Sequence, residues 1–244
     1  GGQDLIFPHH ENEIAQSEAA NCCQFANYWV HNGYINVDNR KMSKSLGNFF
    51  TVRDVAKEFD YEVIRFFMLS AHYRSPINFS KDLMESASSA LERIYTCMDT
   101  LKFLKETASG EDARPEEIPV LEAVNGYKQK FIDAMDDDLN TADAISAIFE
   151  IVSEVNKNIT SASEPSEYLI EYILSVFDEL GSVLGILGRK EKETVPDEVK
   201  EMLEERKNAR ADKDWAKSDL IRDKLKDFGY SVKDTAQGQQ LIKL

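Results

Sequence analysis

The longest regular pattern of hydrophobic positions lies between residues 80 and 190, where apolar residues recur at steps of three and four. This spacing places them on one face of an α-helix. Further helices are expected near 119–135, 144–155 and 169–180, separated by an acidic loop at 106–117 and a break at 164–166. Four amphipathic helices with short connections predict a bundle. The first helix would bury Leu83, Ala87, Ala90, Leu91, Ile94, Met98, Leu101 and Leu104.

The last segment, residues 196–244, predicts a small unit of its own. Two helices are expected, from Asp197 to about Ala211 and from Trp215 to Asp227. Gly229 is suited to end the second helix, because glycine readily takes the left-handed conformation that a helix end requires. Two short alternating runs flank Gly238 and predict a hairpin.

Residues 1 to about 80 combine the spacing of hydrophobic residues typical of helices with that typical of strands. The run 34–39 alternates and predicts a strand or hairpin. Helices are expected from Pro8, a residue suited to a helix start, and at 52–57 and 61–70. The segment 73–79 is expected to be a connector, because Pro76 interrupts a helix. The predicted fold is mainly α with a partial α/β unit, divided at 1–79, 80–190 and 196–244.

The composition fits a chain of several small domains. The 244 residues are 42% hydrophobic, which allows two or three domains. No run of eighteen apolar residues is present, so no membrane partner is expected. The three cysteines have no spacing typical of a disulfide framework, which predicts a cytoplasmic location.

The net charge of -15 argues at first against a nucleic-acid partner. The charge is uneven, however: residues 200–244 hold 11 Lys and Arg against 9 Asp and Glu, whereas the rest holds 18 against 35. An acidic body with a locally basic end suits an enzyme that holds RNA at defined places.

A lysine-containing segment is the strongest chemical signal, with two lysines three positions apart and Gly47 close behind. Lysine is a compact cation with three donors, and the hydroxyl and backbone N–H groups nearby can complete a cradle for a polyphosphate. Fixed cations would stabilise the charge that develops when pyrophosphate leaves an α-phosphate. The alternative is an exposed basic loop. The segment is Lys41-Met42-Ser43-Lys44-Ser45.

The first residues carry a second set of candidates. Gly1 and Gly2 can bring the backbone close to a nucleotide, and Asp4 can accept hydrogen bonds from ribose hydroxyls. His9 and Glu13 are one helical turn apart, a spacing that can chelate zinc. The alternative for this pair is a hydrogen bond on the helix surface. The acidic run 136–138 is interpreted as helix capping in preference to a metal site.

Taken together, these residues resemble the cysteinyl-tRNA synthetases, which are class I enzymes. The segment around Lys44 is shared by many class I synthetases, whereas Pro8 to Glu13 is more specific to the cysteine enzymes. The resemblance implies the C-terminal remnant of a Rossmann-type catalytic domain, a helical bundle and a C-terminal anticodon-binding domain. The similar segments are 1–7, 8–18, 25–29, 31–33 and 41–53.

The resemblance also implies a zinc ion, which holds the thiolate of the cysteine substrate because sulfur is a soft ligand. His9 and Glu13 match two of the four expected ligands. The other two are cysteines expected upstream, outside this chain, and Cys22 and Cys23 do not match them. Cys97 is expected in the core.

ATP, with magnesium, is the second substrate that the resemblance implies. Lys41 and Lys44 would be catalytic, by stabilising the charge on pyrophosphate. The residues expected to bind ATP are Gly2, Asp4, Lys41, Met42, Ser43, Lys44 and Ser45.

The tail resembles the anticodon-binding end of the same family. An arginine can contact phosphate or stack on a base, and a tryptophan can stack on an unpaired base. The alternatives are helix salt bridges around Asp219 and a place in the core for Trp215. The expected contacts with the tRNA for cysteine (tRNA-Cys) are Arg206, Arg210, Trp215, Asp219 and Asp234.

The function expected from the resemblance is a cysteine–tRNA ligase, which joins cysteine to ATP as an adenylate and transfers it to tRNA-Cys. This chain resembles the C-terminal half, and we expect it not to activate cysteine alone, because the upstream ATP motif and two zinc ligands are outside it. Two alternatives remain: a ligase that joins cysteine to an amino sugar, and a non-catalytic tRNA-binding module.

Overall fold

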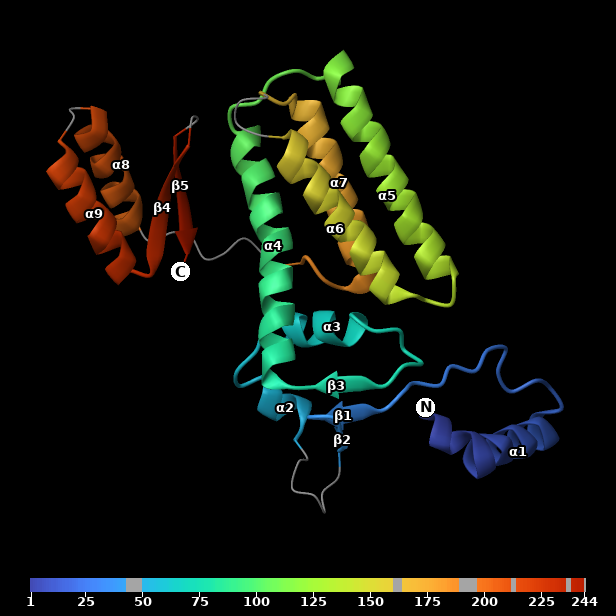
Figure 1. Ribbon diagram of the computed structural model, residues 1–244. Helices are drawn as coiled ribbons and strands as arrows, with labels where there is room; N and C mark the ends of the chain where they lie inside the picture. The colour runs from blue at the N-terminus through green and yellow to red at the C-terminus, as the bar shows by residue number, and fades with distance from the viewer. Residues whose placement is uncertain (43–49, 160–163, 189–196, 212–213, 236–237, 244) are drawn as a thin grey trace. The chain divides into compact units, whose positions relative to one another are not determined.

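The computed structural model describes residues 1–42, 50–159, 164–188, 197–211, 214–235 and 238–243 (Figure 1). The chain forms two compact units. The first comprises residues 1–96 and 125–152, and the second comprises residues 97–124 and 153–244. The boundary passes through three long helices, so the units do not coincide with the three expected parts.

The N-terminal part begins with short helical turns, η1 (Gln3–Leu5) and η2 (Ile6–His10), which lead into α1 (Glu11–Asn21). The α-helix therefore begins three residues after the expected start at Pro8. Two helices follow further along the chain, α2 (Val52–Val55) and α3 (Tyr61–Leu69).

A three-stranded sheet holds the expected hairpin. Its strands are β1 (Ile35–Val37), β2 (Arg40–Lys41) and β3 (Ile77–Phe79), in the order β2-β1-β3. The β1–β2 turn consists of Asp38 and Asn39, with φ of 48° and 60°, and such short polar residues tolerate this conformation better than others. The hairpin prediction is therefore confirmed.

Strand β3 lies within the segment expected to be a connector, so that expectation was wrong for its last three residues. The strand pairs in parallel with β1, so Ile35 lies opposite Ile77 and Val37 opposite Phe79. Its Asn78 side chain also accepts a hydrogen bond from the backbone N–H of Asn39, at 2.7 Å. Strand β3 thus supports both β1 and the turn that leads to β2.

The four expected bundle helices are present: α4 (Lys81–Lys105), α5 (Ile118–Asp136), α6 (Thr141–Asn158) and α7 (Glu167–Leu184). A short turn, η4 (Pro115–Glu117), precedes α5. Most of the apolar positions predicted from the spacing are buried; Ala90 is only half-buried, and the start of α4 shows one shift. Leu83 is exposed, and its neighbour Met84 is fully buried in its place.

The acidic run at the end of α5 does not cap α6 as predicted. Asn140 does so, because its side-chain oxygen accepts a hydrogen bond from the Asp143 N–H at 3.2 Å. Its amide nitrogen donates in return to the Asp143 carboxylate at 2.8 Å. Asp138 and Leu139 have positive φ values of 57° and 56°, which turn the chain and direct Asp138 elsewhere.

The C-terminal part consists of α8 (Asp197–Ala211), α9 (Trp215–Asp227), β4 (Tyr230–Thr235) and β5 (Gly238–Lys243). The two strands pair antiparallel, as predicted, and Gly229 (φ 80°) follows the end of α9. Val199, Ile221 and Leu225 form a small core between the elements. Among the described residues, no helix combines the length and the apolar composition that crossing a membrane requires.

Candidate functional site

The glycine pair at the start of the chain lies against the segment 30–32. The Asn32 N–H donates to the Gly1 carbonyl at 2.8 Å, and the Gly1 amino group donates to the Val30 carbonyl at 3.2 Å. Gly2 forms a parallel bridge with Asn32. Asp4, expected to contact ribose, is exposed. The backbone of the expected nucleotide-binding turn is therefore held by two residues, Val30 and Asn32, that lie about thirty positions later.

A cluster of aromatic rings lies beside this turn. The His10 ring is buried, and its Nδ1 lies 2.9 Å from the Nε2 of His31. The His10 ring centroid is 5.1 Å from that of Trp29. A Cβ added to Gly1 would come within 2.9 Å of the His10 ring, so a side chain at this position would require the ring to shift. A hydrogen bond across this contact would fix the orientation of both rings, which makes this cluster a candidate for substrate orientation.

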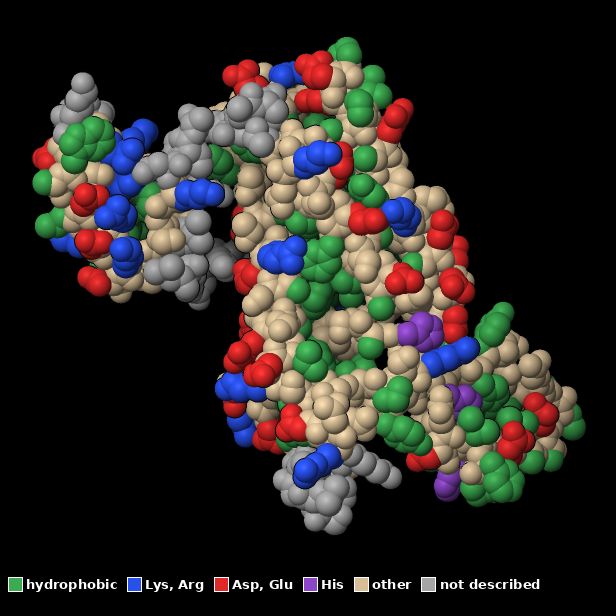
Figure 2. All heavy atoms as spheres, viewed as in Figure 1, with side chains coloured by type: hydrophobic (Ala, Val, Ile, Leu, Met, Phe, Trp, Pro, Cys, Tyr) green, Lys and Arg blue, Asp and Glu red, His purple; other side chains and the backbone are tan. Residues whose placement is uncertain are grey.

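Sequence reasoning missed His10 and His31 as candidates. The available signal was the run Trp29-Val30-His31, which places two ring side chains on the same side of an extended segment. Hydrophobic side chains and histidines gather on the part of the molecule that carries α1 (Figure 2). Exposed apolar residues in this part include Ile6, Phe7, Phe25, Tyr28, Val30 and Tyr34.

His9 and Glu13, the predicted zinc ligands, are both exposed; His9 lies in η2 and Glu13 in the first turn of α1. An imidazole nitrogen and a carboxylate oxygen are donors that zinc accepts, but a zinc site needs four ligands. Among the described residues, no group of three His, Cys, Asp or Glu is close enough to hold a metal ion. The described part of the chain therefore supplies at most two of the four ligands.

Strand β2 leads into the lysine segment. The backbone of Lys41 pairs with Asn36 at the end of the hairpin, and Met42 is half-buried. Ser43, Lys44 and Ser45 lie outside the described residues, as does the side chain of Lys41. The structure thus fixes where the predicted phosphate-binding segment starts.

The segment that follows the lysines is anchored at its other end. The Phe50 ring lies 4.4 Å from that of Phe79 in β3, measured between centroids. Thr51 begins α2 with a reciprocal cap: its hydroxyl accepts from the Asp54 N–H at 3.3 Å, and its own N–H donates to the Asp54 carboxylate at 3.1 Å. The Lys57 ammonium and the Thr51 hydroxyl lower the pKa of Asp54. Both ends of the lysine segment are therefore attached to the same small sheet or to the helix beside it.

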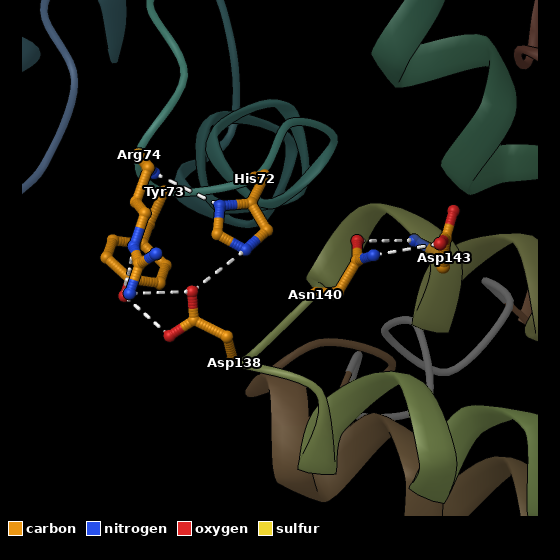
Figure 3. A network of polar contacts seen from close by, with 6 residues as sticks. All are labelled: His72, Tyr73, Arg74, Asp138, Asn140 and Asp143. Carbon is orange, nitrogen blue, oxygen red and sulfur yellow. Dashed lines mark hydrogen bonds and ion pairs between the residues drawn. The ribbon is translucent and has the colours of Figure 1, made fainter.

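Three consecutive residues before β3 converge on Asp138, in the turn between α5 and α6 (Figure 3). The Tyr73 hydroxyl donates to Asp138 Oδ1 at 2.7 Å, and Arg74 Nη2 lies 3.0 Å from Asp138 Oδ2. His72 Nε2 lies 3.6 Å from the same oxygen. Sequence reasoning missed this network, because it joins residues 64 to 66 positions apart and neither segment has a motif.

The predicted tRNA contacts in the C-terminal part differ in how exposed their side chains are. Trp215 begins α9 with 56% of its surface exposed, which excludes the alternative that it is a core residue. The Arg210 guanidinium lies 5.6 Å from the centre of the Trp215 ring, a cation–π arrangement. The pair thus presents a cation and an aromatic face together.

Arg206 is buried, with only 2% of its surface exposed, and its guanidinium donates a hydrogen bond to Gln239. Gln239 in turn donates to the Leu203 carbonyl at 3.1 Å. These contacts join α8 to β5, and the burial favours a structural role for Arg206 over the predicted contact with tRNA.

The last two predicted tRNA contacts are Asp219 and Asp234. Asp219 lies 3.2 Å from Arg222 on α9, which is the helix ion pair named as the alternative. The backbone of Asp234 pairs with Gln239 in the hairpin, and its side chain lies outside the described residues.

Three family models match successive parts of the chain. Residues 1–89 match the class I (C) tRNA synthetase catalytic domain. Residues 130–188 match the DALR domain, and residues 192–241 match the cysteinyl-tRNA ligase anticodon-binding domain. Their order follows the expected order of catalytic part, bundle and anticodon-binding part.

The chain is 52% identical over 238 residues to a cysteine–tRNA ligase of Lachnospira eligens, which covers 98% of this chain and 50% of that protein. It therefore spans about half the length of this curated relative. Among solved structures, the ternary complex of Agrobacterium radiobacter K84 LeuRS with tRNA and LeuAMS matches with a TM-score of 0.59. That match has 19% identity and covers 77% of this chain and 27% of the other, so it supports the fold alone. By its three domain matches and this identity, the chain belongs to the cysteinyl-tRNA synthetase family.

Proposed function

We propose that this chain acts within a cysteine–tRNA ligase, which joins cysteine and ATP into cysteinyl-adenylate and then transfers the cysteinyl group to tRNA-Cys. The observation that carries this proposal is the 52% identity to a cysteine–tRNA ligase along nearly the whole chain. The amino-sugar alternative has no need of the anticodon-binding part that residues 192–241 match.

The N-terminal part would supply ATP binding and the first chemical step. Lys44 and Lys41 would stabilise the charge that develops on pyrophosphate as it leaves, because fixed cations stabilise such a transition state strongly. The attachment of the segment to β2 at one end and to Phe50 and Thr51 at the other supports this role. Gly2 and Asp4 would face the nucleotide, together with Met42, Ser43 and Ser45, and ATP would bring its magnesium ion.

His9 and Glu13 would hold a zinc ion together with two ligands from outside the described residues. When bound, zinc would coordinate the thiolate of the cysteine substrate and so distinguish cysteine from serine. The chain's own contribution is to present the His9 imidazole from η2 and the Glu13 carboxylate from the first turn of α1, four positions apart. Three free cysteines support a reducing, cytoplasmic location.

The C-terminal part would contact tRNA-Cys. The exposed Trp215 ring, with Arg210 beside it, can stack on an unpaired base while the guanidinium contacts a phosphate. Asp219 and Asp234 are weaker candidates for contacts with base edges.

The catalytic half of the proposal is tested with Lys44→Ala in a full-length ligase that contains this sequence. We expect cysteine-dependent exchange between ATP and pyrophosphate to fall by about 100-fold or more, with the unfolding temperature unchanged. Lys57→Ala is a control, since Lys57 is an exposed lysine paired with Asp54 outside the lysine segment. An unchanged exchange rate in the Lys44 variant would exclude the assigned role.

The RNA half is tested by binding of the purified chain to tRNA-Cys and to a second tRNA at one fixed, near-physiological salt concentration. Salt must be fixed, because phosphate contacts alone give unspecific, salt-dependent binding. We expect the chain to prefer tRNA-Cys. We expect Trp215→Ala to weaken the affinity for tRNA-Cys about tenfold, since base stacking on an aromatic ring contributes roughly 1–3 kcal/mol. Leu220→Ala removes another exposed apolar side chain of α9 and should leave the affinity unchanged.

The two tests together distinguish the proposed ligase from a non-catalytic tRNA-binding module. If the chain prefers tRNA-Cys but the full-length protein shows no cysteine-dependent exchange, the function is that of a non-catalytic tRNA-binding module. If there is no preference and Trp215→Ala has no effect, the assignment of the C-terminal contacts is wrong.

A further inference from the structure

The turn between α5 and α6 is connected to the candidate nucleotide-binding turn by a short series of direct contacts. All of the residues concerned lie in the first compact unit, residues 1–96 and 125–152. The series begins at Asp138, passes through the backbone of Tyr73 to Gly33, and ends at the Gly1–Gly2 turn.

The first contact in the series is the convergence of residues 72–74 on Asp138 (Figure 3). Its two carboxylate oxygens are used by different partners, Oδ1 by the Tyr73 hydroxyl and Oδ2 by the Arg74 guanidinium. The Arg74 Nε–H also donates to the Tyr73 hydroxyl oxygen at 3.0 Å. The three side chains thus form a closed set of charge-assisted contacts, which are stronger than neutral hydrogen bonds.

The second contact is made by the backbone of the same residues. The Gly33 N–H donates to the Tyr73 carbonyl at 2.7 Å. A Cβ at Gly33 would lie 2.3 Å from the Ser75 carbonyl oxygen, so the two backbones touch with no room for a side chain. A shift of residues 73–75 therefore has to move Gly33 as well.

The third contact joins Gly33's neighbours to the site. Asn32 donates to the Gly1 carbonyl, and His31 lies within hydrogen-bond distance of the buried His10. Gly1 itself packs against the His10 ring. The position of Gly33 thus bears on both the glycine turn and the histidine pair.

We propose that Asp138 is a positioning residue of the proposed ligase: it holds residues 72–74 in place and thereby fixes the backbone of 31–33 and the Gly1–Gly2 turn beside it. This inference deepens the proposed function and rests on it for its catalytic consequence. Among the candidate substrate-binding residues that the structure describes, none is in direct contact with Asp138, so its effect on them passes through Tyr73 and Gly33.

The backbone conformation at Asp138 determines which substitutions are informative. Its φ of 57° is tolerated by asparagine but strained for alanine. Asp138→Asn keeps an acceptor for the Tyr73 hydroxyl, but it places an NH2 group where Oδ2 faces Arg74, so Arg74 loses both the opposite charge and its acceptor. Tyr73→Phe removes the hydroxyl alone and leaves the turn unchanged. Asp137 is the matched control, because it is the adjacent acid and makes none of the three contacts with residues 72–74.

The structural test is amide hydrogen exchange of the 244-residue chain, read at the Gly33 N–H. We expect Tyr73→Phe and Asp138→Ala to speed this exchange by about tenfold, because loss of a hydrogen bond to a charged group lowers the free energy of local opening. Asp138→Asn should have a smaller effect, and Asp137→Ala none. Amides of α6 from Ala144 to Val155 should be unchanged in all four variants.

An unchanged Gly33 amide in Tyr73→Phe and Asp138→Ala would overturn the inference. So would an equal increase at Gly33 and throughout α6, since this would show general destabilisation without a specific path. These readings do not depend on activity, so they stand apart from the test of the proposed function.

The catalytic test uses the same variants in the full-length ligase. Asp138→Ala should lower kcat for ATP–pyrophosphate exchange about tenfold, leave the Kd for tRNA-Cys unchanged, and be partly restored by Asp138→Asn. A normal kcat together with a faster Gly33 amide would exclude the positioning role. Absence of ATP–pyrophosphate exchange in the unsubstituted ligase would instead contradict the proposed function, whatever the result of the amide hydrogen exchange.

Discussion

Glu117 accepts hydrogen bonds from both the backbone N–H and the hydroxyl of Ser166, each at 2.6 Å, although the two residues are 49 positions apart. Both residues are buried. Glu117 also accepts from the Arg114 N–H at 2.9 Å, and Ser166 caps α7 by accepting from the Leu169 N–H at 3.1 Å. One carboxylate thus links the turn before α5 to the start of α7.

Replacement of Glu117 by alanine should destabilise the chain by about 3 kcal/mol, because three donors would lose their acceptor in a buried place. The measurement is urea unfolding followed by circular dichroism. Glu116→Ala is the control, since Glu116 is the exposed neighbour in the same turn. A Glu117 variant as stable as the Glu116 variant would show that water replaces the carboxylate at little cost.

The same network predicts how stability depends on pH. Burial by itself would raise the pKa of Glu117, but the hydrogen bonds from Ser166 and Arg114 outweigh it and hold the pKa below its ordinary value of 4.5. A carboxyl with a lowered pKa stabilises the fold above pH 4.5, and this contribution is lost as the pH falls through the lower, folded-state pKa. We expect Glu117→Gln to lose less stability than the unsubstituted chain between pH 5 and pH 3. Parallel pH curves for the two proteins would contradict the shift.

The cysteines should differ sharply in reactivity. Cys97 has 2% of its surface exposed, and burial raises the pKa of its thiol to about 12. Cys22 and Cys23 are exposed. Because the thiolate is the reactive form, iodoacetamide at pH 8 should label Cys22 and Cys23 in the native chain and reach Cys97 only after unfolding. Mass spectrometry of the digested protein reads all three sites, and rapid native labelling of Cys97 would show that its helix opens.

Arg206→Ala should unfold the C-terminal part without specifically removing an RNA contact. The change deletes a buried side chain and leaves Gln239 without the donor that joins β5 to α8, which should cost about 2–4 kcal/mol. Lys207→Ala, at the exposed next position, should cost little. Hydrogen exchange at 199–225 distinguishes the two variants. If Arg206→Ala weakens tRNA-Cys binding while these amides stay protected, Arg206 contacts RNA after all.

The periodic parts of this fold follow from the sequence because they depend on local rules. The apolar faces of α4 to α7, the hairpin at Asp38–Asn39 and the glycine after α9 each follow from residues within a few positions of one another. The burial of Arg206 could also have been predicted. Arg206 lies on the same face of α8 as Val199, Met202 and Leu203, the face that packs in the small core. A charged residue on an apolar stripe is a sign of a buried partner.

The polar pairings did not follow from the sequence, because each joins residues far apart in the chain. Asp138 has the surroundings of a helix cap, and only the left-handed turn at 138–139 directs it to Tyr73 and Arg74. His10 and His9 are adjacent and chemically identical, so motif matching selected the exposed one, whereas packing against Trp29 and His31 encloses the other. Such choices depend on tertiary contacts that a spacing rule does not contain.

The strand order β2-β1-β3 has a consequence for how the chain acquires its structure during synthesis. The hairpin of β1 and β2 is made first, but the second neighbour of β1 follows only after the whole of α3 has been translated. Until β3 emerges, the edge of β1 that β3 later covers has no partner among the described strands, and unpaired edges invite association with other chains. Rapid docking of β3 would therefore protect the nascent polypeptide from aggregation at the same place where the mature protein needs its lysine segment fixed.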